Sequence, residues 1–411
     1  MKKIVTLSFV FCQLFSQAQL SPAVTSWVIN ATNQTGFDTI PTNVQWVKYS
    51  SNNVYVHTTD IPDWIPVGYD WPNNPWFPDS MNFTFKITLH PQKNNGPLIK
   101  CPYGHIALWK NGVSIYNPKD AKSYLDSSVW FQNAFYFENN TFDNCLGHPN
   151  GLHEYHTHVN PQCLYDKYND TVHSPIIGFA FDGYPIYGAY AYQDTNGTGA
   201  ITRMRTSYRL RSITDRTILP DGTVLDALHY GPLLSQYQLG AYIEDFEFVP
   251  GLGDLDINNG RFCVTPEYPA GTYAYFVTID DNYEPVYPYV LGPTYYGTVQ
   301  PGNLGPNSGF NVISETVTDF TTGISKLNDE ISFSVYPNPS SDVLIVSVNA
   351  KNAEEISASL YDVNGKAVRT LNNFASNNQQ TISIGNLNAR TYLLQMRKNE
   401  NSTTRKILVV K

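Results

Sequence analysis

Short β-type runs separated by turn-forming residues follow one another along almost the whole chain. Examples are Val54–His57, Phe83–Leu89 and Tyr273–Ile279, each rich in β-branched or aromatic residues. Helical periodicity is confined to two short candidates, Ala121–Asp126 and Leu233–Tyr242. A chain of short strands buries its apolar residues by packing sheets, so we predict an all-β protein whose body is an irregular, loop-rich β-sandwich.

Composition excludes two classes of partner. Charged residues make up 15% of the 411 residues, aromatic residues make up 14%, and the net charge is −9. These values are typical of a folded, aromatic-rich chain and not of a disordered or coiled-coil one. Because positive charge is not in excess, we expect no nucleic-acid partner and no binding to anionic lipid.

The first 18 residues have the organisation of a secretory signal. Lys2 and Lys3 precede an apolar stretch, Ile4–Phe15, and Ser16–Ala18 supplies the small residues of a cleavage site. The apolar stretch is shorter than the roughly 20 residues that span a bilayer, and no later run is long enough, so we expect no transmembrane segment. We predict a signal peptide at 1–18 and export through the periplasm.

The cysteines predict disulfide bonds. Cys12 lies in the predicted signal, so its removal leaves four of the five cysteines, an even number in an oxidising compartment. Four cysteines can pair in three ways, and spacing alone selects none of them. Because Cys145 and Cys163 bracket a histidine-rich segment, we favour a bridge between them, which leaves Cys101 to pair with Cys263. A metal site with thiolate ligands is the alternative.

The sequence pattern of the chain changes after Gln300–Gly309, a segment rich in Gly, Pro and Asn. We place a linker at 299–330 and a second domain at 331–411, where apolar and polar residues alternate regularly. This domain contains no His and no Cys, so we expect no catalysis there. Its pattern predicts a small seven-stranded immunoglobulin-like β-sandwich. The candidate strands are 332–336, 343–348, 356–361, 366–371, 381–384, 391–396 and 406–410.

Four pieces of this second domain form a combined pattern: Tyr336–Pro339, Leu360–Lys366, Tyr392–Leu394 and Lys406–Lys411. Together they resemble the type A C-terminal sorting domain of the type IX (Por) secretion system. The resemblance implies that the type IX machinery carries the protein from the periplasm across the outer membrane, to be released or held at the outer cell surface. A plain spacer or carbohydrate-binding sandwich is the alternative, because many functions share this architecture.

Four of the nine histidines lie between positions 148 and 158. In an extended strand alternate side chains share a face, so we expect Glu154, His156 and His158 together and His153 on the opposite face. Imidazole and carboxylate groups on one face are ligands for a divalent metal such as zinc or copper. We therefore predict a metal site at His156 and His158, with Glu154 as a further ligand. Hydrogen-bonded core histidines are the alternative.

The turn before this segment decides whether His148 joins the site. A two-residue loop, Asn150-Gly151, places His148 on the other face from His156, whereas a three-residue loop that begins at Pro149 places both histidines on the same face. The sequence leaves both loops open. The zincin helix signature is absent, because the spacing between His153 and His156 is one residue shorter than that motif requires.

A longer pattern contains this cluster. Its pieces are Lys110–Val113, Cys145–Cys163, His173–Gly188 and Asn259–Phe276. Together they resemble the YHYH domain family over residues 80–298, within a body that we place at 19–298. Thr157 stands where the family commonly has Tyr, but both histidines of the Tyr155–His158 motif are present. The resemblance implies a metal-binding motif and no particular reaction, because the family's activity is not assigned.

Two further groups are candidate ligands. His173 precedes a Ser-Pro turn and Asp182 lies in an Asp-Gly turn, where turn-stabilising hydrogen bonds are the alternative. Asp254, Asp256 and Asn258 alternate as the oxygen ligands of a calcium loop do. The glycine of such a loop comes one residue late here, and no acidic residue follows at loop position 12.

No serine-nucleophile elbow, dinucleotide loop or phosphate loop is present. We therefore expect a secreted or cell-surface protein that binds a divalent metal through its histidine cluster, with no substrate indicated. The alternative is a metal-dependent extracellular enzyme, a hydrolase or an oxidoreductase, that uses the same site. An open coordination position beside a pocket would favour the enzyme, whereas a closed four-ligand site would favour a structural role.

Overall fold

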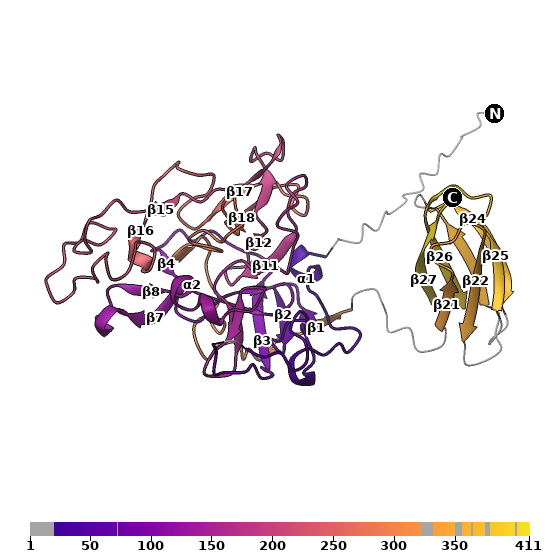
Figure 1. Ribbon diagram of the computed structural model, residues 1–411, viewed down its shortest axis with the longest axis horizontal. Coiled ribbons are helices and arrows are strands. Elements are labelled where there is room, and N and C mark those ends of the chain that lie inside the picture. Colours follow the sequence, from indigo (N-terminus) through magenta and orange to yellow (C-terminus); the bar gives the residue numbers. More distant parts are fainter. Residues whose placement is uncertain are drawn as a thin grey trace, which may run out of the picture. The chain divides into compact units, whose positions relative to one another are not determined.

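The structure, a computed structural model, describes residues 20–71, 73–321, 332–349, 356–362, 365–374, 379–398 and 401–411. The predicted signal peptide at 1–18 lies outside the described residues, as do residues 322–330 of the predicted linker. The chain divides into two compact units, Met1–Phe320 and Thr321–Lys411 (Figure 1). Strands and loops dominate both units, which confirms the predicted all-β class.

A mixed sheet of eight strands forms the centre of the first unit, in the order β17-β18-β12-β11-β5-β6-β10-β9. β10 pairs with β6 in parallel and β12 pairs with β18 in parallel, while the other neighbours are antiparallel. The histidine-rich segment therefore lies at one edge of this sheet. The strands are β5 His105–Trp109, β6 Ser114–Tyr116, β9 Gly147–Pro149, β10 Tyr155–Thr157, β11 Ile176–Ala180, β12 Pro185–Tyr187, β17 Gly260–Cys263 and β18 Thr272–Phe276.

A second, antiparallel sheet has the order β20-β1-β2-β3. Its strands are β1 Val44–Tyr49, β2 Asn53–Thr58, β3 Phe83–Thr88 and β20 Thr318–Phe320. Val54 and Phe85 of this sheet share one buried cluster with Leu108, Phe179 and Phe276 of the central sheet. The two sheets thus bury apolar faces against each other, and burial of this apolar area is the main driving force for such packing.

The other face of the central sheet is covered by loops. Trp109, Ile186 and Tyr275 on that face share a second buried cluster with Tyr287 and Leu291 from the loops. Short strand pairs organise these loops: β4 Ile99–Lys100 with β19 Thr294–Tyr295, β7 Lys119–Ser123 with β8 Phe131–Asn133, β13 Tyr190–Tyr192 with β14 Ile201–Arg203, and β15 Tyr208–Leu210 with β16 Phe246–Phe248.

The helices are short. α1 spans Pro22–Thr25 and α2 spans Ala134–Phe137, and none of the helices among the described residues has the length and apolar character needed to cross a membrane. The predicted helical turn at 121–126 is only a 3₁₀ turn, Tyr124–Asp126, that follows β7. The predicted helix at 233–242 is wrong, because this segment forms turns around Gly240, whose φ is +98°.

Residues 299–320, which the composition assigns to a linker, pack on the first unit. The amide of Thr84 donates to the carbonyl oxygen of Gly309, and the amide of Lys86 donates to the side chain of Asn303. β20 extends the second sheet by pairing with β1. Gly and Pro residues here supply turns within a packed segment, so composition alone does not distinguish it from a free linker.

The second unit contains seven strands among its described residues, which confirms the predicted sandwich. One sheet has the order β21-β22-β25 and the other has the order β24-β23-β26-β27. Leu344, Leu360 and Ile407 belong to the buried cluster that both sheets contribute to. The strands are β21 Ser332–Tyr336, β22 Val343–Asn349, β23 Ile356–Tyr361, β24 Ala367–Phe374, β25 Gln379–Ser383, β26 Arg390–Lys398 and β27 Asn401–Val409.

Candidate metal centre

The register of β9 and β10 places His148 directly opposite His156. The loop between these strands runs from Asn150 to Glu154, so it is longer than either predicted loop. Its shape depends on Asn150, whose Oδ1 accepts the backbone amides of Leu152 and Glu154 at 2.8 and 3.2 Å. His148 and His156 therefore share a face, which is the arrangement that the three-residue alternative predicts.

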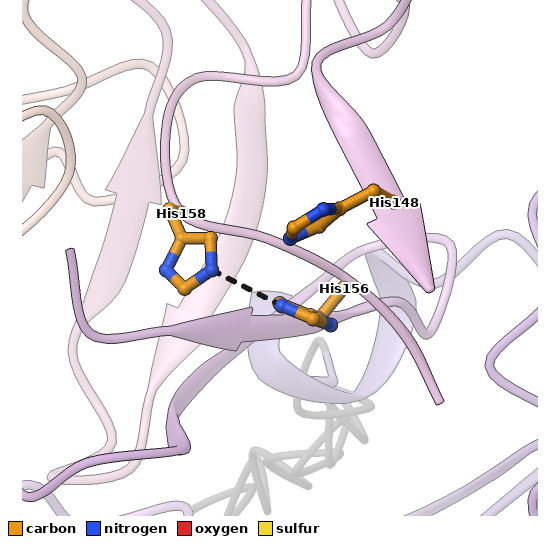
Figure 2. A group of neighbouring side chains, drawn as sticks. All are labelled: His148, His156 and His158. Carbon is orange, nitrogen blue, oxygen red and sulfur yellow. Dashed lines mark hydrogen bonds between the residues drawn. The ribbon is translucent and has the colours of Figure 1, made fainter. Parts of the chain in front are cut away.

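The imidazoles of His148, His156 and His158 converge at the edge of the central sheet (Figure 2). One ring nitrogen of each residue lies within 4.8 Å of those of the other two. Nε2 of His156 is 3.1 Å from Nε2 of His158, and all three residues are buried. Two residues of this group, His156 and His158, are the pair that the alternation of side chains along a strand predicts to share a face.

The outer nitrogens of His156 and His158 each have a backbone acceptor. Nδ1 of His156 is 3.2 Å from the carbonyl oxygen of Glu154, and Nδ1 of His158 is 2.9 Å from the carbonyl oxygen of Asn117. A carbonyl oxygen can only accept, so Nδ1 donates in both rings. Nε2 of each neutral ring then keeps its lone pair, and these two atoms point toward each other.

His148 has the same tautomer for a different reason. Its Nδ1 is 2.7 Å from Oγ1 of Thr141, and that hydroxyl donates its own proton to the carbonyl oxygen of Glu138 at 2.7 Å. Thr141 therefore accepts from Nδ1 of His148. Nε2 of His148 is buried and has no hydrogen-bond partner among the described residues. In their neutral forms all three rings therefore carry the free lone pair on Nε2, the form in which imidazole binds metal.

Burial disfavours the charged form of two of these rings, His148 and His156. Burial and the neighbouring imidazole of His158 lower the pKa of His148 to about 3. Burial and the imidazoles of His148 and His158 lower the pKa of His156 well below its usual value. Protonation of His148 or His156 is therefore disfavoured in the folded protein.

Glu138, directly after α2, lies beside the three imidazoles. Its Oε2 is 3.3 Å from Nε2 of His158 and 3.7 Å from Nε2 of His148. Burial opposes ionisation of this carboxyl group, but the neighbouring imidazoles outweigh burial and hold its pKa below the usual value. An ionised oxygen beside acceptor nitrogens is unfavourable unless a proton on His158 or a metal cation lies between them. No spacing in the sequence relates Glu138 to the histidines, so it was not predicted.

The three imidazoles line a pocket of about 400 Å³. The ring of Tyr116, also in the lining, stacks on His156 with 4.0 Å between the ring centroids. The imidazoles therefore border a cavity and are not sealed in by protein on every side. Further lining residues include Asn74, Trp76, Asp120, Lys122 and Phe137.

Contrary to the prediction, Glu154 does not join the three imidazoles. Its Oε1 is 2.5 Å from Nε2 of His105, and both side chains are buried. The ring of Tyr116 contacts both His105 and His156, with centroid distances of 5.3 and 4.0 Å. The bulky ring of Tyr116 thus lies between the partner of Glu154 and the cluster. The third member of the cluster is His148, and not the Glu154 carboxylate that the sequence analysis placed beside His156 and His158.

His173 and Asp182 lie apart from the cluster and have structural partners. Nδ1 of His173 is 2.7 Å from the carbonyl oxygen of Ser174. Oδ2 of Asp182 accepts from the hydroxyl of Tyr275 at 2.6 Å and from the amide of Gly297 at 2.8 Å. Burial raises the pKa of Asp182 to about 6. Both residues therefore have the hydrogen-bonding roles given above as the alternative.

The three side chains of the predicted calcium loop each have a different protein partner. Those partners are an arginine, a tyrosine and a threonine, so the loop oxygens do not share one ligand position. The contacts are Asp254 Oδ2 to Arg205 Nε at 3.0 Å, Asp256 Oδ1 to the Tyr273 hydroxyl at 2.8 Å, and Asn258 Oδ1 to Thr294 Oγ1 at 2.7 Å.

A disulfide joins Cys145 to Cys163, as predicted. The predicted second bridge is wrong, because Cys101 and Cys263 are free thiols. Cys101 packs against the cluster on the loop-covered face of the central sheet, where its Sγ donates to the carbonyl oxygen of Gly292 at 3.3 Å. Cys263 belongs to the cluster between the two sheets. The central sheet therefore separates the two thiols.

Replacing both Cys145 and Cys163 with Ser is expected to lower the free energy of unfolding by about 3 kcal/mol, because the bridge closes a loop with a sequence separation of 18. The loop contains all three clustered histidines, so metal affinity should fall as well. Denaturant unfolding of oxidised protein measures the first effect, with Cys101→Ser as the control. Equal stability of the double variant and the wild type would contradict this expectation.

Comparison with known families finds one match in each of the two units. Residues 84–287 match the family described as YHYH protein, and this range contains the three clustered histidines and both bridged cysteines. Residues 334–410 match the family described as secretion system C-terminal sorting domain. No curated protein matches the chain. The sorting domain directs a protein to the cell surface or the extracellular space. The chain is thus a secreted or cell-surface protein with a YHYH domain and a C-terminal sorting domain of the type IX secretion system.

Proposed function

We propose that the YHYH domain binds one divalent metal ion through Nε2 of His148, His156 and His158. The convergence of three Nε2 lone pairs on one point carries this proposal. Three imidazoles are a ligand set that zinc and copper both accept. Each Nδ1–H has an acceptor that fixes its ring orientation, which is the outer-shell arrangement typical of metal-binding histidines.

Hydrogen bonding alone does not account for the cluster. One shared proton would satisfy the contact between Nε2 of His156 and Nε2 of His158, but it would leave Nε2 of His148 without a partner. The low pKa of His148 opposes a second proton on its own Nε2. A cation satisfies all three nitrogens together and offsets the negative charge of the adjacent Glu138. Calcium fits poorly here, because it prefers oxygen ligands.

A metal-dependent enzyme is the second candidate function, and the pocket favours it. Structural zinc sites are closed by four protein ligands, whereas catalytic sites keep an open position. Three imidazoles in the lining of a 400 Å³ pocket correspond to the second arrangement. A divalent ion held there supplies a Lewis acid and lowers the pKa of bound water. Glu138 would accept a proton at Oε2, which lies 3.3 and 3.7 Å from two of the ligand nitrogens.

Elemental analysis tests the metal proposal. The purified protein is dialysed against equimolar trace copper, zinc and manganese and then passed through a desalting column. We expect about one equivalent of copper or zinc per chain to remain, because three convergent imidazoles hold these ions more tightly than manganese. Wild-type protein that retains no metal under these conditions would contradict the proposal.

We also propose that residues 1–18 are removed as a signal peptide before the type IX machinery acts on the C-terminal unit. The basic start, the apolar stretch and the Ser16–Ala18 cleavage site support the first step. The match of residues 334–410 to the sorting domain supports the second. The mature chain then begins at Gln19, and the body and sorting unit extend over the remaining residues.

A further inference from the structure

A large apolar ring lies exposed at the pocket that holds the three imidazoles. Trp76 lines this pocket and is 44% exposed. All seven tryptophans of the chain lie in its described part, and Trp76 is the only one with an exposed side chain. An indole carries a large apolar face, so this ring at the pocket is available for contact with a ligand.

Hydrogen bonds hold Trp76 in position next to the histidine strands. Oδ1 of Asn74 accepts the backbone amide of Trp76 at 3.0 Å, and Nδ2 of Asn74 donates to the carbonyl oxygen of Pro149 at 2.9 Å. Pro149 follows His148 in β9. The indole also lies against Gly151, where a Cβ would be 3.6 Å from the ring. The backbone of Trp76 is therefore tied to β9, and its ring lies against the loop between the two histidine strands.

Charged side chains of both signs line the same pocket. Asp120 and Lys122 are two residues apart on β7, so they share one face of that strand, and both belong to the pocket lining. Glu138 adds a second carboxylate. The carboxylates are offset by Lys122 and by the proposed divalent ion, so the pocket does not select strongly for an anion or a cation. It offers hydrogen-bond donors and acceptors together.

An exposed indole face beside mixed donors and acceptors matches the chemistry of a saccharide. One face of a sugar ring is apolar and stacks on an aromatic ring, while its hydroxyl groups both donate and accept. We infer that a saccharide binds in this pocket, with its ring on Trp76 and its hydroxyl groups on Asp120 and Lys122. The inference names the substrate class of the proposed metal centre; any reaction rests on that proposed function, but the binding itself does not.

Saturation-transfer NMR with the full-length protein tests the inference. The probes are glucose, galactose, mannose, xylose, N-acetylglucosamine and glucuronate, each added as the free sugar. We expect saturation transfer to at least one sugar in the wild type. Trp76→Ala is expected to lower the affinity for that sugar about tenfold, because the substitution removes the aromatic ring on which the sugar stacks. Unchanged thermal unfolding would show that this exposed side chain was not needed for folding.

Phe77→Ala is the matched control. Phe77 follows Trp76, is 49% exposed and stacks on Phe37, but it does not line the pocket. Sugar binding should be unchanged in this variant and in wild-type protein treated with a chelator. Failure of metal binding with retained sugar binding would therefore reject only the metal centre. No transfer to any of the six sugars, or equal binding by the wild type and Trp76→Ala, would overturn the inference.

Discussion

Replacing any one of His148, His156 and His158 with Ala is expected to lower metal affinity by more than about 100-fold, because changes outside the ligand set alone cost up to that factor. The physical reason is the small number of ligands. When one of three imidazole ligands is removed, only two protein nitrogens remain, and two imidazoles hold a divalent ion weakly. The three variants should therefore emerge from desalting with almost no copper or zinc.

His153→Ala is the control for this series. His153 lies in the loop between the same two strands, but its Nδ1 is 2.8 Å from the carbonyl oxygen of Phe77, outside the cluster. Its metal content should equal that of the wild type. Elemental analysis of all four variants, together with their melting temperatures after chelation, distinguishes metal ligands from hydrogen-bonding core residues. Lower melting temperatures without any change in metal content would make the three histidines hydrogen-bonding core residues.

A chain that ends at Phe320 is expected to fold and to stay behind the outer membrane, so that its amount in the culture medium falls to background. The sorting unit begins beyond this residue, whereas β20 at Thr318–Phe320 still pairs with β1. The truncated protein should keep its metal content and its melting temperature. Immunoblots of medium, periplasm and cells measure the distribution, and mass spectrometry of the periplasmic sample tests for a mature terminus at Gln19.

A chain that ends at Thr298 is the comparison that separates folding from export. It lacks the hydrogen bonds that Asn303 and Gly309 make to β3, and it also lacks Ser308, whose hydroxyl is 2.8 Å from Nδ1 of His105. Its melting temperature should be lower than that of the chain ending at Phe320. Equal amounts of the Phe320 chain and the full-length chain in the medium would contradict the role of the sorting unit.

Properties that depend on neighbouring residues could be predicted from the sequence. Alternation of apolar and polar residues predicts the seven strands of the second unit, because that period belongs to a strand with one buried face. The same alternation places His156 and His158 on one side of β10. The bridge between Cys145 and Cys163 follows from their positions around the histidines. Each of these features depends on residues that are close together in the chain.

The remaining site features depend on contacts that no local pattern contains. Side-chain hydrogen bonds of Asn150 set the loop length and so the face of His148. Glu154 pairs with His105, which is 49 positions away in the chain. Glu138 reaches the cluster from the end of α2. These groups come into contact only when two strands and a helix have packed together. Their spacing along the chain therefore does not predict the contact.

The position of the disulfide has a consequence for the proposed metal site. Cys145 and Cys163 enclose His148, His156 and His158 in one covalent ring. Disulfides form and persist in oxidising compartments and are rare in a reducing cytoplasm. The covalent ring around the proposed ligands is therefore closed only after the chain has left the cytosol, where an ion bound at the proposed site would come from the supply of copper and zinc in that outer compartment. Protein produced in a reducing cytosol would meet a different metal supply with its ring still open.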